Sequence, residues 1–304
     1  MKTTRDVVAE LAALDAKVNA FLPPQYSHCY QSVSPTSMGS AGLALGPDGK
    51  VAWDQIWTTF CDLALAGGPP HRGRLLEPIS GEEVAAAPER YAEVVAEIGR
   101  AIRLTTGLSM KAGYAPGWIG VVCKSTMEAA WLQFAITAEN VSARRKGEIL
   151  QLPAGPGFRV EKEIKNVVVA LGKAYHYWDG HLTVEQQSLA GGCVWEPASP
   201  SEAAAKPTEY NAAAGEVESA LLAAGMTPLP RRYAGWLGFQ TGGEEEAVWL
   251  LRAILVHQVL VRREERVLFI PFGATPCEEH ASRIRSAVSE ACRLYRASRR
   301  RRVR

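Results

Sequence analysis

The spacing of apolar and polar positions changes along the chain, and the same order of spacings occurs twice. Each time, the pattern predicts a helix, a short strand, a second helix, a hairpin with a tight turn, and a last helix. In the first copy these elements are predicted at residues 91–105, 118–122, 128–137, 141–152 and 161–178. In the second copy they are predicted at residues 210–224, 236–240, 244–257, 259–270 and 278–297. Gly107 and Gly225 follow the two first helices and suit a helix C-terminus.

Residue identities repeat in the same register. Glu77-Pro78 recurs as Glu196-Pro197, 119 positions later (196 − 77 = 119), and Gly117-Trp118 recurs as Gly235-Trp236, 118 positions later (236 − 118 = 118). One deletion explains the change of spacing. We therefore predict an α+β fold made by tandem duplication of an α-β-α-β-β-α unit, with helices packed on an antiparallel or mixed sheet and two halves related by a pseudo-twofold axis.

The repeat sets the expected domain boundaries. Residues 1–72 are predicted to be an N-terminal helical extension, with helices over 4–21 and 53–65 and a flexible loop at 32–50. The first repeat covers 73–178, a linker 179–192, the second repeat 193–297, and a basic tail 298–304.

Composition narrows the class of protein. At 304 residues, with 47% hydrophobic and 22% charged residues, the chain has ordinary globular composition and can bury a large core. No apolar run reaches the length of a membrane-spanning helix, and the start leads into no signal-type apolar block, so we expect a cytoplasmic protein that does not bind membranes. The six cysteines are scattered, which favours buried free thiols.

Charge is uneven although the formal net charge is only +2. Arg299 to Arg302 and Arg304 crowd the C-terminus, where cations complement a helix dipole. Nucleic-acid binding through this tail is the less favoured interpretation, because the net charge is small.

The two predicted hairpins differ in character. With a two-residue turn at Lys146-Gly147, Asn140, Ser142 and Arg144 share one polar face, and Gln151 lies opposite Ser142. The second hairpin has apolar residues along both faces and is predicted to be buried on both. Both copies of a duplicated unit must keep the residues that pack the core, whereas functional residues can be kept in only one copy. Because only the first hairpin has a polar face, we predict a site on the first copy.

The residues predicted for this site carry positive charge or hydrogen-bonding groups. Guanidinium and ammonium groups bind carboxylates and phosphates, so we expect an anionic ligand. The predicted ligand-binding residues are Arg72, Lys124, Asn140, Ser142, Arg144 and Lys165. Glu139 or Glu163 is the predicted acid or base. His71 is the other predicted catalytic residue and lies in the loop Gly67 to Gly73, where glycines allow a ligand to approach the backbone.

Structural interpretations of the same residues stay open. Glu139, Glu163 and Lys165 fit solvated helix surfaces, and Arg145 fits a hairpin salt bridge with Glu148. Arg144 recurs as Arg262, which favours a role in the fold as much as in binding. The tryptophans at 118 and 236 favour core packing for the same reason, and the loop at 67–73 also fits a rigid helix stop.

Metal and nucleotide chemistry have little local support. His176 and His181 flank Asp179, but no third ligand is evident and we predict no metal site. The motifs GxGxxG after a strand, GxSxG, HExxH and CxxC are absent from the sequence. No particular cofactor is indicated.

Three functions are compatible with these patterns. The first is binding, with or without chemical transformation, of a small carboxylate or phosphate metabolite on the first repeat near the cleft between repeats. The second is a non-catalytic accessory or assembly role, in which the duplicated units bind a protein partner through an apolar surface. The third, nucleic-acid binding, is disfavoured. Whether the protein is an enzyme is left open.

Overall fold

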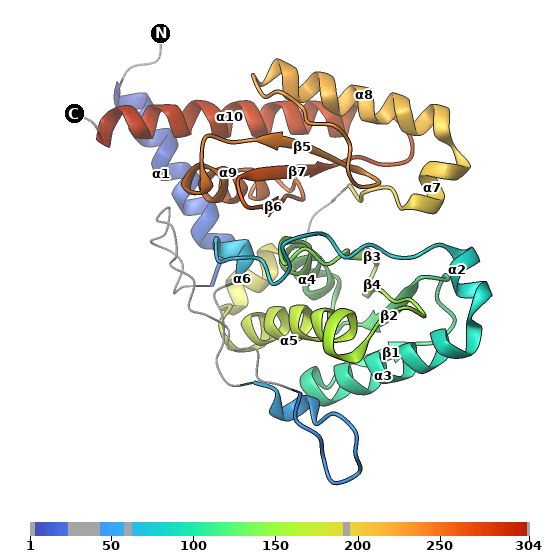
Figure 1. The fold of residues 1–304 in the computed structure, drawn as a ribbon. Helices are drawn as coiled ribbons and strands as arrows, with labels where there is room; N and C mark the ends of the chain where they lie inside the picture. Colours follow the sequence, from blue (N-terminus) through green and yellow to red (C-terminus); the bar gives the residue numbers. More distant parts are fainter. Residues whose placement is uncertain (1–3, 24–42, 58–62, 191–194, 303–304) are drawn as a thin grey trace. The chain divides into compact units, whose positions relative to one another are not determined.

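The computed structural model describes residues 4–23, 43–57, 63–190 and 195–302, which fold as two compact units. The middle unit consists of Val33–Ala64 and Gly68–Leu182. The C-terminal unit consists of Met1–Ser32, Leu65–Gly67 and Thr183–Arg304. Over the described residues the fold is mixed α+β, with ten α-helices and two antiparallel sheets (Figure 1).

The middle unit contains a four-stranded sheet in the order β1-β2-β4-β3. Short 3-10 turns at Trp53–Gln55 and Ala64–Ala66 precede it in the chain. Its elements are α2 (Gly81–Ala86), α3 (Pro88–Thr106), β1 (Ser109–Lys111), β2 (Trp118–Val122), α4 (Thr126–Ala138), β3 (Arg144–Lys146), β4 (Ile149–Pro153), a π-helical turn (Val160–Ile164) and α5 (Lys165–Gly180).

The C-terminal unit contains a three-stranded sheet in the order β5-β7-β6. Its elements are α1 (Thr4–Phe21), α6 (Val184–Leu189), α7 (Pro200–Ala205), α8 (Pro207–Ala223), β5 (Trp236–Gln240), α9 (Glu244–Leu255), β6 (Arg262–Glu264), β7 (Val267–Pro271) and α10 (Glu278–Arg302). From α3 to α5 and from α8 to α10, the order of helices and strands is the same apart from β1.

Local sequence signals fix the helix ends. Ser80 and Ser199 each form a capping box. The serine side chain accepts from the backbone N–H of the third helical residue, a glutamate, and the glutamate side chain accepts from the serine backbone N–H. Pro88 and Pro207 begin the next helix of each unit, where a missing N–H carries no penalty. Gly107 ends α3 in a left-handed conformation with φ of 72°.

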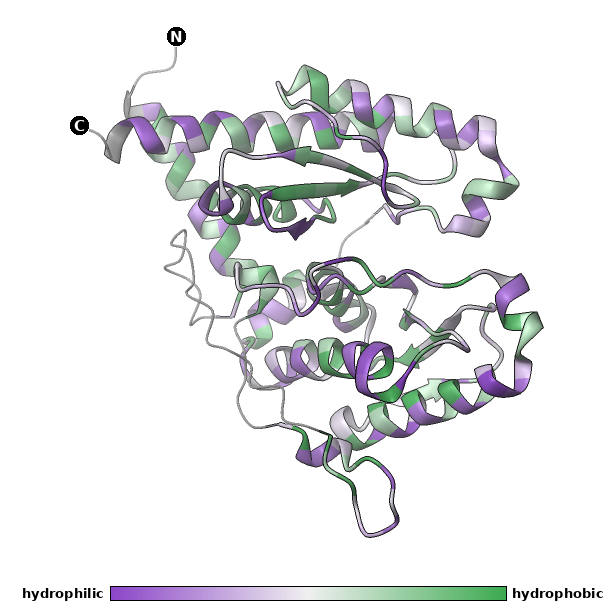
Figure 2. Ribbon diagram, in the orientation of Figure 1, coloured by the Kyte–Doolittle hydropathy of each residue, from purple (hydrophilic) through white to green (hydrophobic). Residues whose placement is uncertain are grey.

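Buried apolar faces hold each unit together. Every residue of α4 from Glu128 to Ala138 and of α9 from Ala247 to Leu255 is buried. Trp131 packs on Trp178 with ring centroids 6.0 Å apart, and Trp249 packs on Tyr295 at 5.4 Å. Figure 2 shows apolar strands β5 and β7 beside α10, a helix of mixed polarity, as expected for a helix with one buried face.

The two sheets have corresponding registers. Trp118 pairs with Pro153, and Trp236 pairs with Pro271. Arg144 pairs with Gln151, and Arg262 pairs with Phe269. In each comparison, both residues of the pair in the C-terminal unit lie 118 positions after their counterparts in the middle unit.

The backbone repeats an uncommon conformation at corresponding positions. Asn140 and Gln258 both have φ of 60°, just after α4 and α9. Gly147 and Glu265, in the two hairpin turns, have φ of 61° and 51°. Left-handed backbone disfavours most side chains, so its recurrence at Gln258 and Glu265 reflects the requirements of the turns.

The hairpin turn differs from the prediction by one residue. The turn residues are Gly147 and Glu148, not Lys146 and Gly147, and Arg145 pairs with Leu150 instead of Glu148. The physical reason is that the first turn position needs positive φ, which Gly147 supplies. Asn140 and Ser142 precede β3, so they do not form a strand face with Arg144.

Several predicted segments have a different local structure. The described part of the expected 53–65 helix consists of two 3-10 turns. Residues 32–42 of the expected flexible loop lie outside the described residues, while Leu45 and Val51 form an antiparallel bridge. The expected linker includes α6, and the basic tail continues α10 to Arg302. Over the described residues, no helix has the length and apolar character required to cross a membrane.

Candidate functional site

A cavity of about 540 Å³ lies in the middle unit, between α3 and the segment that runs from β1 to β2. We call it the α3–β1 pocket. Its size falls in the range of small-molecule sites. The lining residues are Tyr91, Val95, Ala96, Gly99, Arg100, Arg103, Met110, Lys111, Ala112, Gly113, Tyr114, Trp118 and Ile119.

Three aromatic rings line the pocket and are held by polar contacts. The Tyr91 hydroxyl donates to the Trp118 carbonyl at 3.1 Å. Tyr114 hydrogen-bonds Gln151, and its ring covers Gly120. Burial raises the pKa of Tyr91, although a hydrogen bond with the Gly117 backbone opposes the shift, and it raises the pKa of Tyr114 against the hydrogen bond with Gln151, so both phenols are neutral at neutral pH.

Three cations reach the same pocket. Arg100 and Arg103 come from α3, and Lys111 ends β1. Arg103 and Lys111 are exposed, and within the described part of the chain neither makes an ion pair. None of the lining residues is a carboxylate. The pocket therefore presents uncompensated positive charge beside aromatic surface.

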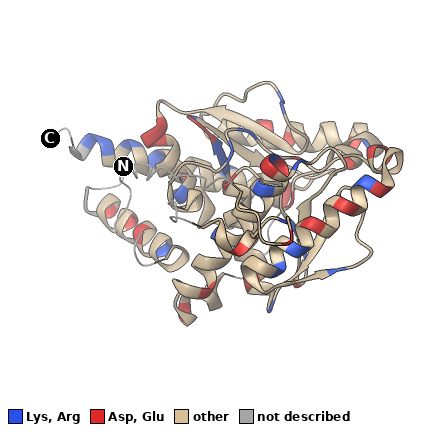
Figure 3. Ribbon diagram, turned by 60° about the horizontal axis from the view of Figure 1, so that its bottom comes forward, with Lys and Arg blue, Asp and Glu red and all other residues tan. Residues whose placement is uncertain are grey.

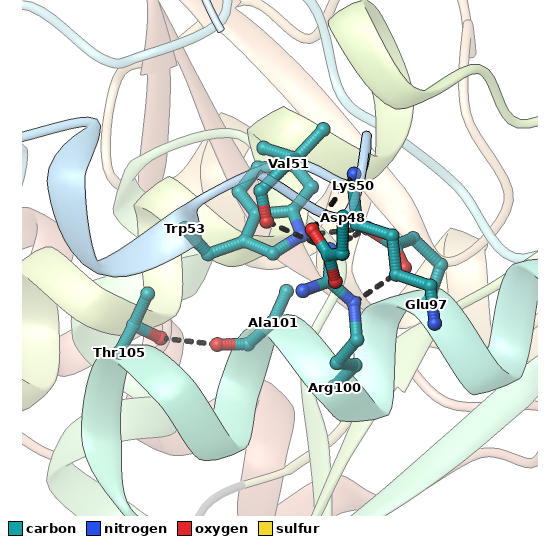
Figure 4. A network of polar contacts seen from close by, with 8 residues as sticks. All are labelled: Asp48, Lys50, Val51, Trp53, Glu97, Arg100, Ala101 and Thr105. Atoms are coloured by element: carbon teal, nitrogen blue, oxygen red, sulfur yellow. Dashed lines mark hydrogen bonds and ion pairs between the residues drawn. The ribbon is translucent and has the colours of Figure 1, made fainter. Parts of the chain in front are cut away.

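Arg100 is fixed by a polar network (Figure 4). Its guanidinium donates to Glu97 at 2.6 and 2.8 Å and to the Val51 carbonyl at 2.8 Å. Trp53, fully buried, donates to the same carboxylate at 2.7 Å. Burial alone would raise the pKa of Glu97, but the hydrogen bonds from Arg100 and Trp53 outweigh it and lower that pKa. Arg100 is thus a positioned group whose charge is largely balanced.

The predicted acid Glu139 lies elsewhere in the middle unit, fully buried at the end of α4. Its carboxylate accepts from the Ala64 and His71 backbone N–H groups at 3.0 and 2.8 Å and pairs with Lys173 at 2.7 Å. Both carboxylate oxygens therefore have partners within the protein. These contacts hold Ala64 and His71 against α4 and α5.

The predicted residues of the 67–73 loop join this cluster. The Arg72 N–H donates to the Glu139 carbonyl at 3.3 Å, and the Asn140 side chain donates to the Arg72 carbonyl at 2.8 Å. Burial lowers the pKa of His71, although Glu139 opposes the shift. Asn166 hydrogen-bonds His71, and Lys165 lies close enough to act on it electrostatically. The structure thus brings Glu139, His71, Arg72 and Asn140 together, with Lys165 nearby; a catalytic role for them stays a prediction.

The other predicted residues lie apart from that cluster. Lys124 is exposed and pairs with Asp179 at 3.2 Å. Ser142 is buried, and its N–H donates to the Leu76 carbonyl at 3.0 Å. The Arg144 guanidinium lies 5.5 Å from the ring centroid of Trp118, which lines the α3–β1 pocket. Arg144 is therefore the predicted cation adjacent to the pocket.

Arg100, Arg103 and Lys111 were not among the sequence candidates. A signal for two of them was present, because Arg100 and Arg103 correspond at 119 positions to Ser219 and Leu222. Lys111 corresponds at 118 positions to Leu229, which follows the isolated bridge between Pro228 and Phe239 and donates its N–H to the Gly238 carbonyl, so the same signal was present for the third cation.

Metal ligands do not gather in the described parts of the chain. The Nε2 atoms of His176 and His181 lie 3.0 Å apart. The described residues contain no group of three or more His, Cys, Asp or Glu that could hold a metal ion. The positive charge at the end of α10 is visible in Figure 3. Part of it is paired: Arg293 with Glu10 at 2.6 Å and Arg299 with Glu245 at 3.6 Å.

The chain was compared with known protein families, curated proteins and solved structures. A scan with protein-family models found no match, and searches of curated proteins and of solved structures found none either.

Proposed function

We propose that the protein binds a small carboxylate or phosphate compound in the α3–β1 pocket. The observation that carries the proposal is the combination of Arg103 and Lys111, two exposed cations, with a pocket wall that contains no carboxylate. Keeping two like charges near each other is unfavourable without a counter-ion, and an anionic ligand supplies one. Guanidinium and ammonium groups both form charge-assisted hydrogen bonds with such a ligand.

A tandem duplication is part of the same proposal. Its support is the 118-position correspondence of strand register and of left-handed positions in the two units. The 119-position correspondence extends to packing, because Ile98 and Ala101 of α3 and their counterparts Val217 and Ala220 of α8 are all buried. One ancestral unit would produce all three patterns.

The difference between the copies then favours a ligand on the first. The buried positions of α3 keep their apolar character in α8, but Arg100 is replaced by Ser219 and Arg103 by Leu222, which is 56% exposed. Loss of the cations that line the pocket, without loss of the core, is expected where one copy has given up ligand binding. We place the ligand on the first repeat alone.

Isothermal titration calorimetry with benzoate, succinate and inorganic phosphate tests the proposal. We expect at least one of these anions to bind the native chain, and Arg103→Ala or Lys111→Ala to weaken that binding about tenfold each, since a hydrogen bond to a charged group contributes about 1.5 kcal/mol. Binding should also weaken as ionic strength rises.

Arg90→Ala is the matched control. Arg90 lies on α3, is exposed and paired with Glu93, and does not line the pocket. Its removal takes one positive charge from the same helix and should leave affinity within about twofold of wild type. Equal effects of all three substitutions, or no binding of any anion, would contradict the proposal and favour the protein-partner alternative.

A further inference from the structure

The aromatic side of the α3–β1 pocket indicates the body of the ligand, not only its charge. We infer that the pocket takes a planar aromatic or heteroaromatic anion, with its ring against Tyr91, Tyr114 and Trp118 and its charged group toward Arg103 and Lys111. This inference rests on the proposed function. It adds a requirement for a flat apolar ring that anion binding alone does not impose.

Tyr91 and Trp118 form a fixed aromatic surface. Tyr91 is anchored through its hydroxyl to the Trp118 carbonyl at 3.1 Å, and Trp118 is only 7% exposed. Arg144 lies 5.5 Å from the Trp118 ring centroid, which further restricts that ring. Rings that are already held lose little conformational entropy when a ligand stacks on them.

Tyr114 occupies a position that depends on a glycine and on Gln151. A Cβ atom at Gly120 would lie 2.3 Å from the Tyr114 ring, so only glycine permits this placement. In the C-terminal unit the residue matching Gln151 is Phe269, whose ring takes the place over Gly238. The replacement of Phe269 by Gln151 therefore leaves room for the Tyr114 ring, which becomes a wall of the pocket.

The opposite wall leaves space for a flat group. Gly99 carries no side chain where α3 faces the pocket, and a Cβ there would already approach Met110 to 3.1 Å. A polarisable thioether and three rings are surfaces that favour an aromatic ligand over an aliphatic one. At about 540 Å³ the pocket has space for a bicyclic ring with its acidic group.

The test compares 2-naphthoate with decahydro-2-naphthoate, which share a carboxylate and a carbon skeleton but differ in planarity and aromaticity. We expect the native chain to bind 2-naphthoate about fivefold more tightly, in the range that aromatic contacts add beyond buried area. Calorimetry or saturation-transfer NMR gives both dissociation constants.

Two variants separate the ring from the charge. Tyr114→Leu keeps apolar volume but removes one of the three rings, so it should reduce the preference for 2-naphthoate while leaving inorganic phosphate affinity within twofold. Arg103→Ala should weaken both naphthoates equally and keep the preference. Tyr175→Leu, a half-buried tyrosine of the same unit outside the pocket lining, is the control, and thermal melting of each variant verifies folding.

The outcomes distinguish the two proposals. Equal affinity for both naphthoates, lowered in the Arg103→Ala variant, would overturn the aromatic inference and keep the anion site. Unchanged preference in Tyr114→Leu would likewise overturn it. Failure of phosphate and of every carboxylate to bind would overturn both.

Discussion

At the scale of single residues, His280 shows how packing sets a titration. Its ring stacks on Trp195 with centroids 4.8 Å apart and planes 4° from parallel. The Arg283 guanidinium lies 4.3 Å from the centroid of the same Trp195 ring. Burial, reinforced by the nearby Arg283 charge, lowers the pKa of His280 from 6.5 to about 4. The folded protein therefore holds a neutral imidazole where the unfolded chain binds a proton more readily.

This shift predicts a loss of stability on acidification. Between pH 6.5 and 4 the unfolded state binds more protons at this position than the folded state, so stability falls as pH falls, by up to about 3 kcal/mol from His280 alone. Urea unfolding of wild type and His280→Phe at pH 7.5, 5.5 and 4.5 measures it. The phenylalanine keeps the stack on Trp195, so the variant should lose less stability than wild type over this range; identical pH slopes would refute the assignment.

Single residues were also predicted with unequal success. Trp118 and Trp236 were expected in the core, and they are 7% and 2% exposed. The sequence showed that Arg144 recurs as Arg262, but it did not show that the two side chains differ in burial. Arg262 is fully buried among Tyr233, Trp236 and Phe269 and pairs with Glu264 at 2.8 Å. Arg144 is only half-buried, because Gln151 stands where the second unit has Phe269.

At the scale of elements, the Glu139–Lys173 ion pair connects α4, α5 and the segment before α2. The two side chains are 0% and 2% exposed, and the backbone N–H groups of Ala64 and His71 complete the carboxylate's partners. A buried pair of this kind costs desolvation energy, which the ion pair and the hydrogen bonds to the carboxylate offset.

Removal of one partner should therefore cost more than removal of both. We expect Glu139→Gln to lower the free energy of unfolding by about 3–5 kcal/mol, because Lys173 is left buried without its counter-charge. Adding Lys173→Met should recover part of that loss. Chemical denaturation of both variants gives the values, and hydrogen exchange at His71 reports whether the loop is released. A double variant less stable than Glu139→Gln would contradict this account.

The sequence predicted most helices and strands, but it did not always predict where they end or which residues form the turns. Alternation and turn residues predicted the hairpins, yet the turn was placed one residue early, since two adjacent turns fit the same sequence and only the pairing with β4 distinguishes them. The expected helix at 53–65 has 3-10 turns in its described parts. Apolar residues at helical spacing also suit irregular segments that a core surrounds.

At the scale of the whole molecule, the proposed duplication predicts a measurable superposition. In a crystal structure we expect the segment from β2 to β4 to superpose on the segment from β5 to β7 with residues 118 apart coinciding, and α3 on α8 with residues 119 apart. A pseudo-twofold duplication further requires a rotation near 180° between the halves. A better superposition in another register would contradict the duplication, whereas a different rotation would contradict only the symmetry.

By itself, the sequence determined the mixed α+β class, the repeated order of elements and much of the apolar core, because periodicity and local signals such as capping boxes act over a few residues. Only the tertiary structure decided which side chains meet. Arg103 and Lys111 are separated by a helix end and a strand, and they reach one pocket because α3 packs along β1. Glu139 was predicted to be an acid or base; that the carboxylate is buried beside Lys173 was decided by the tertiary structure, since charge pairing over long sequence distances depends on how helices pack and leaves no local pattern.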